Sequence, residues 1–216
     1  MNIGAPLTSD TLADILARDV SRETLAADAI RRLEIYADTL RAWQPRINLV
    51  STATLDDLWR RHMLDSAQLA RWAGPDKRVL DLGSGAGFPG LVLSIVTGGP
   101  VVLAESDARK CAFLREVRRL TDAPAEIVEG RIEDLAPDAA YDVVTARALA
   151  PLPVLLDHAS AHLKSNGFCL FLKGARVSAE LTNANEFWNM NANRYPSLSD
   201  PEGAVLQIGS LSRVRS

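Results

Sequence analysis

The sequence contains few of the features that assign a chain quickly to a functional class. It has only two cysteines, Cys111 and Cys169, far apart in a helix-like and a strand-like segment. A disulfide framework, a cysteine-based metal site and a cysteine nucleophile are therefore not expected. The chain also has no apolar run of membrane-spanning length, and no basic start followed by an apolar segment. We predict a cytoplasmic protein with reduced core cysteines, without a metal ion and without a membrane helix.

The chain also lacks an excess of positive charge. Its 24 lysines and arginines are outnumbered by 27 acidic residues, which gives a formal net charge of −3 and no general attraction to nucleic acid. Basic residues are nevertheless concentrated in residues 107–120, which carry five basic and two acidic side chains. This segment is either part of a basic patch or an ordinary solvated helix face.

The length of 216 residues is enough for one large core, and 47% hydrophobic residues are available to fill it. We expect two parts, a helical extension over residues 1–73 that packs on a domain over residues 74–216.

The most informative stretch is RVLDLGSGAGFPG, residues 78–90. An apolar run ends at Gly83, three more glycines follow, and an apolar helix-like segment begins at Leu91, which predicts a strand, a tight turn and a helix. Glycine enters φ > 0 freely and lets a ligand approach the backbone, and a helix N-terminus adds unpaired N–H groups. The stretch therefore predicts a site for a nucleotide-like cofactor, although a turn that only reverses the chain has the same composition.

Two cofactors fit this turn. GAGFPG, residues 85–90, matches the dinucleotide fingerprint G-x-G-x-x-G, but a lone match is weak. Asp81, Gly83 and Gly85 form the acidic-x-G-x-G arrangement typical of S-adenosylmethionine sites, in which backbone and acid meet an amino acid end. We favour S-adenosylmethionine, with the alternative that Asp81 only caps the turn.

The segment before this turn is predicted to be helical over residues 9–72. Apolar residues recur at spacings of three and four from Leu25 to Trp43, and Ser21 and Pro45 are expected to begin and end that helix. A second helix is expected to be capped by Thr54, with Asp57 completing a capping-box-like pair.

The second helix carries a polar cluster that includes Arg61, His62, Asp65 and Ser66. His62 and Asp65 are three apart and share a face. The cluster is either the wall of a cleft or a His–Asp hydrogen bond that only fixes helix packing.

From residue 78 onward, strand-like and helix-like segments alternate. Such alternation predicts right-handed βαβ crossovers and a parallel sheet that is covered on both faces. Expected features at the end are an Asn166-Gly167 turn before a strand, a helix over residues 177–190 and a hairpin around residues 200–203. The predicted fold is the class I S-adenosylmethionine-dependent methyltransferase fold, an α/β Rossmann-like, mostly parallel seven-stranded sheet with an antiparallel C-terminal hairpin and an N-terminal helical extension.

Ligands of open α/β sheets bind beyond the carboxyl ends of the strands. We therefore assign cofactor and substrate contacts to the residues at those strand ends. Glu105 is expected to accept both ribose hydroxyls, although an acid here also serves NAD. Ile132 and Glu133 are expected to flank an adenine ring. Arg147 is expected to hold the methionine carboxylate or a substrate phosphate. The alternative for each of these side chains is that it belongs to an ordinary loop residue without a role in binding.

These motifs together resemble the ribosomal RNA small subunit methyltransferase G family (RsmG, or GidB). The resemblance covers residues 43–174, and the tail after Gly174 departs from it, with SLSRVRS in place of the usual closing strand and lysine. The motifs, in chain order, are NLVS, RHMLDS, VLDLGSGAGFPGLVLSI, LAES, RKCAFLREV, RIEDL, VVTARALAPL and LFLKG.

The resemblance implies methyl transfer from S-adenosylmethionine to ring nitrogen 7 of a guanine in the 530 loop of bacterial 16S rRNA. That nitrogen loses no proton on methylation, so alignment and electrostatics suffice without a general base. The implied partner is 16S rRNA or the small ribosomal subunit, and we expect the protein to be a monomer. By motif position, the family's cofactor contacts fall on Gly83, Phe88, Ile132, Glu133 and Arg147.

Substrate and catalytic roles are expected for a further group of residues. His62 and Asp65 are expected to shape the pocket, with Arg61 and Arg147 beside them. Candidates for gripping RNA are Arg61, Arg109, Lys110, Arg147 and Lys173. Two alternatives remain, a nicotinamide-dependent oxidoreductase that uses GAGFPG and a non-catalytic RNA-binding protein.

Overall fold

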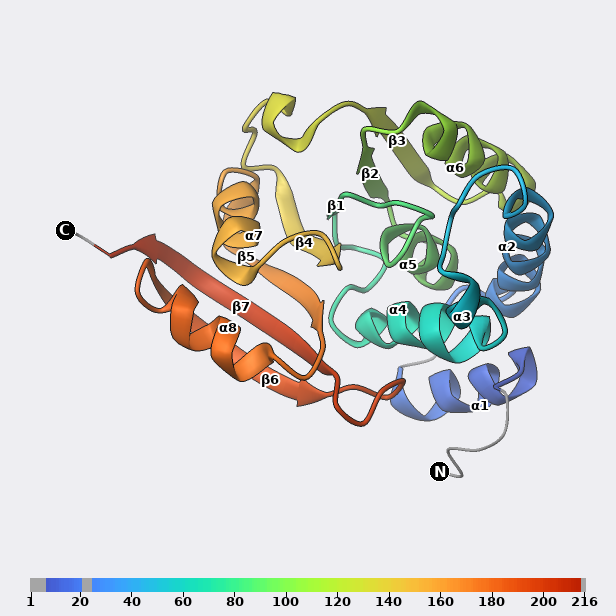
Figure 1. The fold of residues 1–216 in the computed structure, drawn as a ribbon, viewed down its shortest axis with the longest axis horizontal. Coiled ribbons are helices and arrows are strands. Elements are labelled where there is room, and N and C mark those ends of the chain that lie inside the picture. Colours follow the sequence, from blue (N-terminus) through green and yellow to red (C-terminus); the bar gives the residue numbers. More distant parts are fainter. Residues whose placement is uncertain (1–6, 21–24, 215–216) are drawn as a thin grey trace.

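A computed structural model of the chain describes residues 7–20 and 25–214. Within this part the strands form one seven-stranded sheet in the order β3-β2-β1-β4-β5-β7-β6 (Figure 1). The first five are parallel to one another, whereas β7 runs antiparallel between β5 and β6. The strands are β1 Val79–Leu82, β2 Val101–Glu105, β3 Ala125–Glu129, β4 Tyr141–Arg147, β5 Leu163–Lys173, β6 Trp188–Pro196 and β7 Ala204–Arg213.

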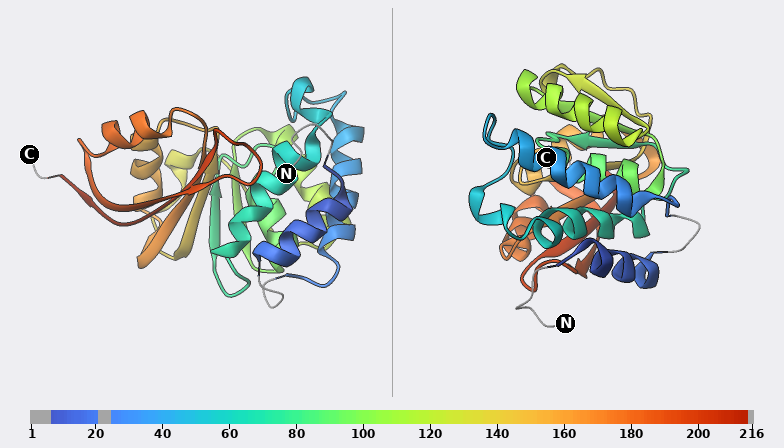
Figure 2. Two further views of the ribbon diagram at one scale, coloured as in Figure 1. Left: turned by 90° about the horizontal axis from the view of Figure 1, so that it is seen from below. Right: turned by 90° about the vertical axis from the view of Figure 1, so that its right-hand side faces the viewer.

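Helices cover both faces of this sheet (Figure 2). The alternation of side chains along each strand separates two hydrophobic clusters, with Val79 and Val101 on one face and Leu80 and Val102 on the other. The helices of the first face are α1 Ser9–Asp19, α2 Ala29–Trp43, α4 Asp65–Ala67, α5 Gly90–Thr97 and α6 Ala108–Thr121. Those of the second face are α7 Leu152–Ser160 and α8 Val177–Ala184.

The N-terminal helices belong to the same hydrophobic cluster as the first face of the sheet. Leu33, Tyr36 and Leu40 of α2 are fully buried and pack in one cluster with Leu91 of α5 and Phe113 of α6. Tyr36 of α2 reaches the turn between β1 and α5, where its hydroxyl bonds to the carbonyl of Ala86. No helix in residues 7–20 or 25–214 combines the length and the apolar character needed to cross a membrane.

The segment between α2 and β1 is a chain of short helices. They are α3 Thr52–Leu55, a π-helix Trp59–Leu64, α4 and a 3-10 helix Gln68–Arg71. Thr54 does not cap the second helix as predicted, because it is an inner residue of α3, whose N-cap position is held by Ser51. Its hydroxyl instead bonds to Nε2 of His62 at 2.9 Å. The start of α2 also differs, with Asp28 at its N-cap position, and Ser21 lies outside the described residues.

Three predictions for the C-terminal third were wrong. Asn166 and Gly167 form no turn but lie inside β5, where the pairing shifts from Tyr141↔Leu163 to Val143↔Phe168. Helix α8 ends at Ala184 instead of residue 190, because buried Trp188 already begins the edge strand β6 and the asparagine-rich segment favours helix poorly. The tail does supply a closing strand, since β7 continues to Arg213.

Candidate active site

The turn between β1 and α5 has the backbone that its glycines predict. Gly83, Gly85 and Gly87 have φ of 63°, 59° and 96°. A Cβ on Gly87 would lie 2.6 Å from the hydroxyl oxygen of Tyr36, so this position is also closed sterically. Tyr36 donates its hydroxyl to the carbonyl of Ala86 and holds the turn from α2.

Asp81 braces this turn from inside. Its carboxylate accepts from the backbone N–H of Gly90 at 3.2 Å and from the hydroxyl of Thr145 at 2.7 Å. The side chain is fully buried, and burial raises its pKa to about 6 against the opposing effect of these bonds. Asp81 therefore caps the turn, which was the alternative to a contact with the ligand.

A cavity of about 560 Å³ opens beside the turn, at the carboxyl ends of β1, β2 and β4. The structure brings every predicted cofactor residue to its wall. These residues are Gly83, Gly85, Phe88, Glu105, Ile132, Glu133 and Arg147.

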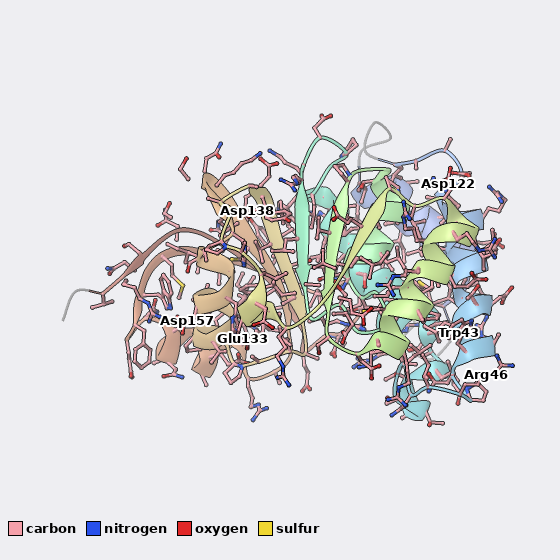
Figure 3. The ribbon with its side chains drawn as sticks, turned by 90° about the horizontal axis from the view of Figure 1, so that it is seen from above. Trp43, Arg46, Asp122, Glu133, Asp138 and Asp157 are labelled. Atoms are coloured by element: carbon pink, nitrogen blue, oxygen red, sulfur yellow. The ribbon has the colours of Figure 1, made fainter. Side chains whose placement is uncertain are left out.

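Figure 3 shows the position of Glu133 relative to the sheet. Glu133 follows β3, whereas Asp122 and Asp138 precede β3 and β4, and the two groups lie at opposite ends of the sheet (Figure 3). Trp43 and Arg46, near the end of α2, lie toward the same end as Glu133 (Figure 3). The cavity is therefore on the rim where ligands of open α/β sheets bind.

Glu105 is fixed in this cavity by backbone groups on both sides. Its Oε2 accepts from the N–H of Gly85 at 2.7 Å and its Oε1 from the N–H of Asp107 at 2.8 Å. The residue is 7% exposed. Because a carboxylate has about four acceptor positions, about two remain for hydroxyl groups of a ligand.

Arg147 is the last residue of β4 and lines both this cavity and a second one. Its Nη1 donates to the carbonyl of Arg61 at 3.0 Å and lies 3.4 Å from Oδ2 of Asp65. Its guanidinium carbon is 4.9 Å from the ring centroid of Phe88. Nη2 also bonds to Nδ1 of His62 at 2.8 Å. Three groups from the π-helix and α4, together with one aromatic ring, thus fix the orientation of this cation.

His62 is neutral in this arrangement. Burial, followed by the charges of Arg147 and Arg61, lowers its pKa to about 3. Since Arg147 is always protonated, Nδ1 of His62 accepts and Nε2 carries the proton that it donates to Thr54. The imidazole also stacks on Phe88, with centroids 4.8 Å apart.

His62 and Asp65 each bond to Arg147, and both line a cavity, as a cleft wall predicts. The alternative, a direct His–Asp hydrogen bond, is replaced by a bridge through the arginine. Burial raises the pKa of Asp65, while Arg147 and Ser199 act in the opposite direction. The hydroxyl of Ser199 donates to Asp65 at 2.6 Å. The loop between β6 and β7 is thereby tied to α4.

The second cavity, of about 850 Å³, shares Arg147, Ala148 and Leu149 with the first. Its wall also includes Arg61 and Lys173. The two cavities therefore meet at the end of β4, as a two-substrate transfer requires.

The predicted RNA-gripping residues have different environments. Arg61 pairs with Asp200 at 2.9 Å, and Arg109 pairs with Asp107 at 3.2 Å. Lys173 is not directed at solvent, because its Nζ donates to Glu180 at 2.8 Å and to the carbonyl of Ala150 at 3.0 Å.

The ammonium of Lys173 thus braces the loop after β4, and its side chain is only 9% exposed. Lys110 lines the first cavity and Arg61 the second.

Sequence reasoning missed several residues that build the site. Tyr36 lies on the apolar helix face predicted between Leu25 and Trp43, and a phenol at such a position carries a polar tip that needs a partner. Gln68 donates to Ser197 at 3.2 Å and accepts from the N–H of Leu198 at 2.9 Å. Nothing in the local sequence of these residues signals contacts across 50 to 130 positions.

The sequence and the fold both match known proteins. Residues 29–203 match the model of the GidB family, described as rRNA small subunit methyltransferase G. Among relatives, the chain is 55% identical to ribosomal RNA small subunit methyltransferase G of Paramagnetospirillum magneticum, over 91% of this chain and 94% of that protein. It is 49% identical to the protein of the same name from Gluconobacter oxydans, over 88% of this chain and 98% of that one.

Solved structures match at lower identity. A SAM-dependent methyltransferase from Aquifex aeolicus superposes with a TM-score of 0.57 at 17% identity, covering 72% of this chain and 95% of that one. TYW2 from M. jannaschii in complex with AdoMet superposes with a TM-score of 0.56 at 15% identity, covering 79% and 80%. These likenesses show the class I S-adenosylmethionine-dependent methyltransferase fold.

Proposed function

This chain belongs to the rRNA small subunit methyltransferase G family, and we propose that it transfers a methyl group from S-adenosylmethionine to ring nitrogen 7 of a guanine in the 530 loop of 16S rRNA. The observation that carries the proposal is the junction of two cavities at Arg147, Ala148 and Leu149. One cavity is suited to the methyl donor and the other to the acceptor nucleotide. Family membership favours this reading over a nicotinamide-dependent oxidoreductase.

The residues of the first cavity fit S-adenosylmethionine. Its volume of about 560 Å³ lies within the range of small-ligand sites, roughly 300–1,000 Å³. Glu105 has acceptor positions left for the two ribose hydroxyls, and Gly83 lets the amino acid end approach the backbone. Ile132 offers apolar surface to the adenine and Glu133 a polar group to its edge. When bound, S-adenosylmethionine supplies an electrophilic methyl group on a positively charged sulfur.

Arg147 positions the two reactants through the part of its guanidinium that the protein leaves free. Three of its N–H groups face Arg61, Asp65 and His62, out of five that an arginine carries. The remaining groups can donate to the methionine carboxylate or to an oxygen of the acceptor nucleotide. Asp65 offsets the charge of Arg147, so the site repels a cationic sulfur less than an unpaired arginine would.

No residue of the site has to remove a proton. Ring nitrogen 7 of guanine reacts through a lone pair, and the neutral His62 uses its own lone pair to hold Arg147. Catalysis therefore consists of alignment and fixed electrostatics. Because the pKa of His62 is about 3, a plot of rate against pH should show no loss of activity from protonation of His62 near neutral pH.

Methyl mapping tests the proposal. The protein is incubated with S-adenosylmethionine and either naked 16S rRNA or small subunits from a strain that lacks this modification. Reduction and aniline treatment then cleave the strand at guanines methylated on nitrogen 7, and primer extension locates the break. A new stop in the 530 loop is expected. Methyl incorporation at any other nucleotide, or none on either substrate, would contradict the proposal.

A further inference from the structure

One face of α8 forms part of the wall of the second cavity. Arg176, at its N-cap position, is followed at helical spacing by Ala179, Glu180 and Asn183, and all four line the cavity. Helix α8 lies beside the C-terminal hairpin and α7, on the second face of the sheet (Figure 1). Arg176, Ala179 and Asn183 have no role in the methyl transfer proposed above.

The charges of this cavity do not balance. Four cationic side chains line it, and three of them each have an acidic partner on the same wall. The pairs are Arg147 with Asp65, Arg61 with Asp200, and Lys173 with Glu180. His62 adds no charge at neutral pH, since its pKa is about 3. Arg176 is the cation without an acid, so the cavity carries one positive charge in excess although the whole protein is acidic.

Arg176 and Asn183 are also free to bind. Both are exposed, and within residues 7–20 and 25–214 neither side chain has a hydrogen-bond partner or ion pair. Ala179 between them is exposed and small, which leaves the surface of the helix open to a ligand. A long cation and a carboxamide, two turns apart beside the acceptor cavity, suit a chain of alternating phosphates and hydroxyls.

We propose that this face of α8 binds the sugar-phosphate backbone of the RNA next to the target nucleotide. Arg176 donates to a phosphate, and Asn183 bonds to the sugar or phosphate of a neighbouring nucleotide. This inference rests on the proposed function for the identity of the polyanion as rRNA. It adds to that function the element that holds the strand while the target guanine occupies the cavity.

Binding of the rRNA substrate at several salt concentrations tests the proposal. Arg176→Ala should weaken binding about tenfold, as expected for loss of one charge-assisted hydrogen bond. It should also reduce the slope of log affinity against log salt by about 0.7 to 0.9. Arg18→Ala is the matched control, because Arg18 is an exposed arginine of α1 that lines neither cavity. Arg176→Lys should keep most of the affinity, and Asn183→Ala should weaken binding without changing the salt slope.

Kinetics separate this role from a structural one. Arg176→Ala should raise KM for rRNA and leave kcat and the affinity for S-adenosylhomocysteine unchanged. Affinity and salt slope equal to those of Arg18→Ala would overturn the proposal. Because RNA binding is measured apart from methyl transfer, a wild-type protein that methylates no rRNA contradicts the proposed function, whereas unchanged binding by Arg176→Ala contradicts only the role of α8.

Discussion

Replacing Asp81 by asparagine tests how the cofactor turn is held. The side chain is fully buried, and its carboxylate accepts from Gly90 and Thr145. Asparagine has the same shape, can accept from Gly90 with its carbonyl, and can donate its amide to the hydroxyl of Thr145. The substitution therefore removes the buried charge and preserves both contacts.

The sign of the effect follows from the pKa of Asp81. Burial raises it from 3.8 to about 6 in the folded protein, so between these pH values the folded state binds the proton that the unfolded chain has lost. The free energy of unfolding of the wild type therefore falls as pH rises through this window. At about 1.4 kcal/mol for each pKa unit, the charge costs roughly 3 kcal/mol at neutral pH. Asp81→Asn should be more stable than the wild type by up to this amount at pH 7.5, and equal to it near pH 4.

Urea unfolding followed by circular dichroism from pH 4 to pH 8 measures this difference. Asp142→Asn is the control of opposite sign. Burial raises the pKa of Asp142, but hydrogen bonds from Lys164 and the N–H of Arg78 together outweigh it and hold that pKa below its usual value. That variant should be less stable than the wild type at neutral pH and converge with it in acid.

Asp81→Asn also distinguishes a structural role of Asp81 in the turn from a direct contact with the ligand. Because Asp81→Asn keeps the turn, its affinity for S-adenosylhomocysteine should stay within about threefold of the wild type. A variant that is less stable than the wild type by the same amount at every pH would refute the reasoning about burial. Loss of binding with the turn intact would instead give Asp81 the ligand contact that its hydrogen bonds argue against.

Three further substitutions probe the frame of the site. Glu105→Gln should weaken S-adenosylhomocysteine binding about 10- to 100-fold, since an amide lacks the charge that strengthens each hydrogen bond by roughly 1 kcal/mol; unchanged affinity in calorimetry would contradict the ribose contact. Tyr36→Phe leaves the carbonyl of Ala86 without its donor and should lower the free energy of unfolding by about 1–3 kcal/mol; an unchanged urea midpoint would count against it. Lys173→Met strands the half-buried carboxylate of Glu180 and should cost about 1–3 kcal/mol, and adding Glu180→Gln should restore part of that loss if the ion pair is the cause.

The order of the core elements could be predicted from local patterns. A mostly apolar strand, four glycines in eight positions and an apolar helix identify β1, the turn and α5 without any knowledge of distant residues. The same holds for the positions of Glu105 and Arg147, because a residue at the end of a parallel strand reaches the ligand rim wherever its neighbours lie.

The orientation of side chains around that rim could not be predicted in the same way. β1 is buried on both faces, so its alternation does not say that Asp81 points toward Gly90 and Thr145 and not into the first cavity. His62 and Asp65 share a helix face, but their common partner Arg147 is more than 80 residues away. The end of α8 was missed because burial of Trp188 in the second cluster, a tertiary contact, ends the helix.

A crystal structure of the protein with S-adenosylhomocysteine tests most directly whether the cavity at the carboxyl ends of β1, β2 and β4 is the methyl-donor site. We expect the ribose hydroxyls within hydrogen-bond distance of Glu105, the amino acid end against Gly83 and the adenine beside Ile132. A nucleoside bound anywhere else, or an empty cavity at a saturating ligand concentration, would contradict the assignment.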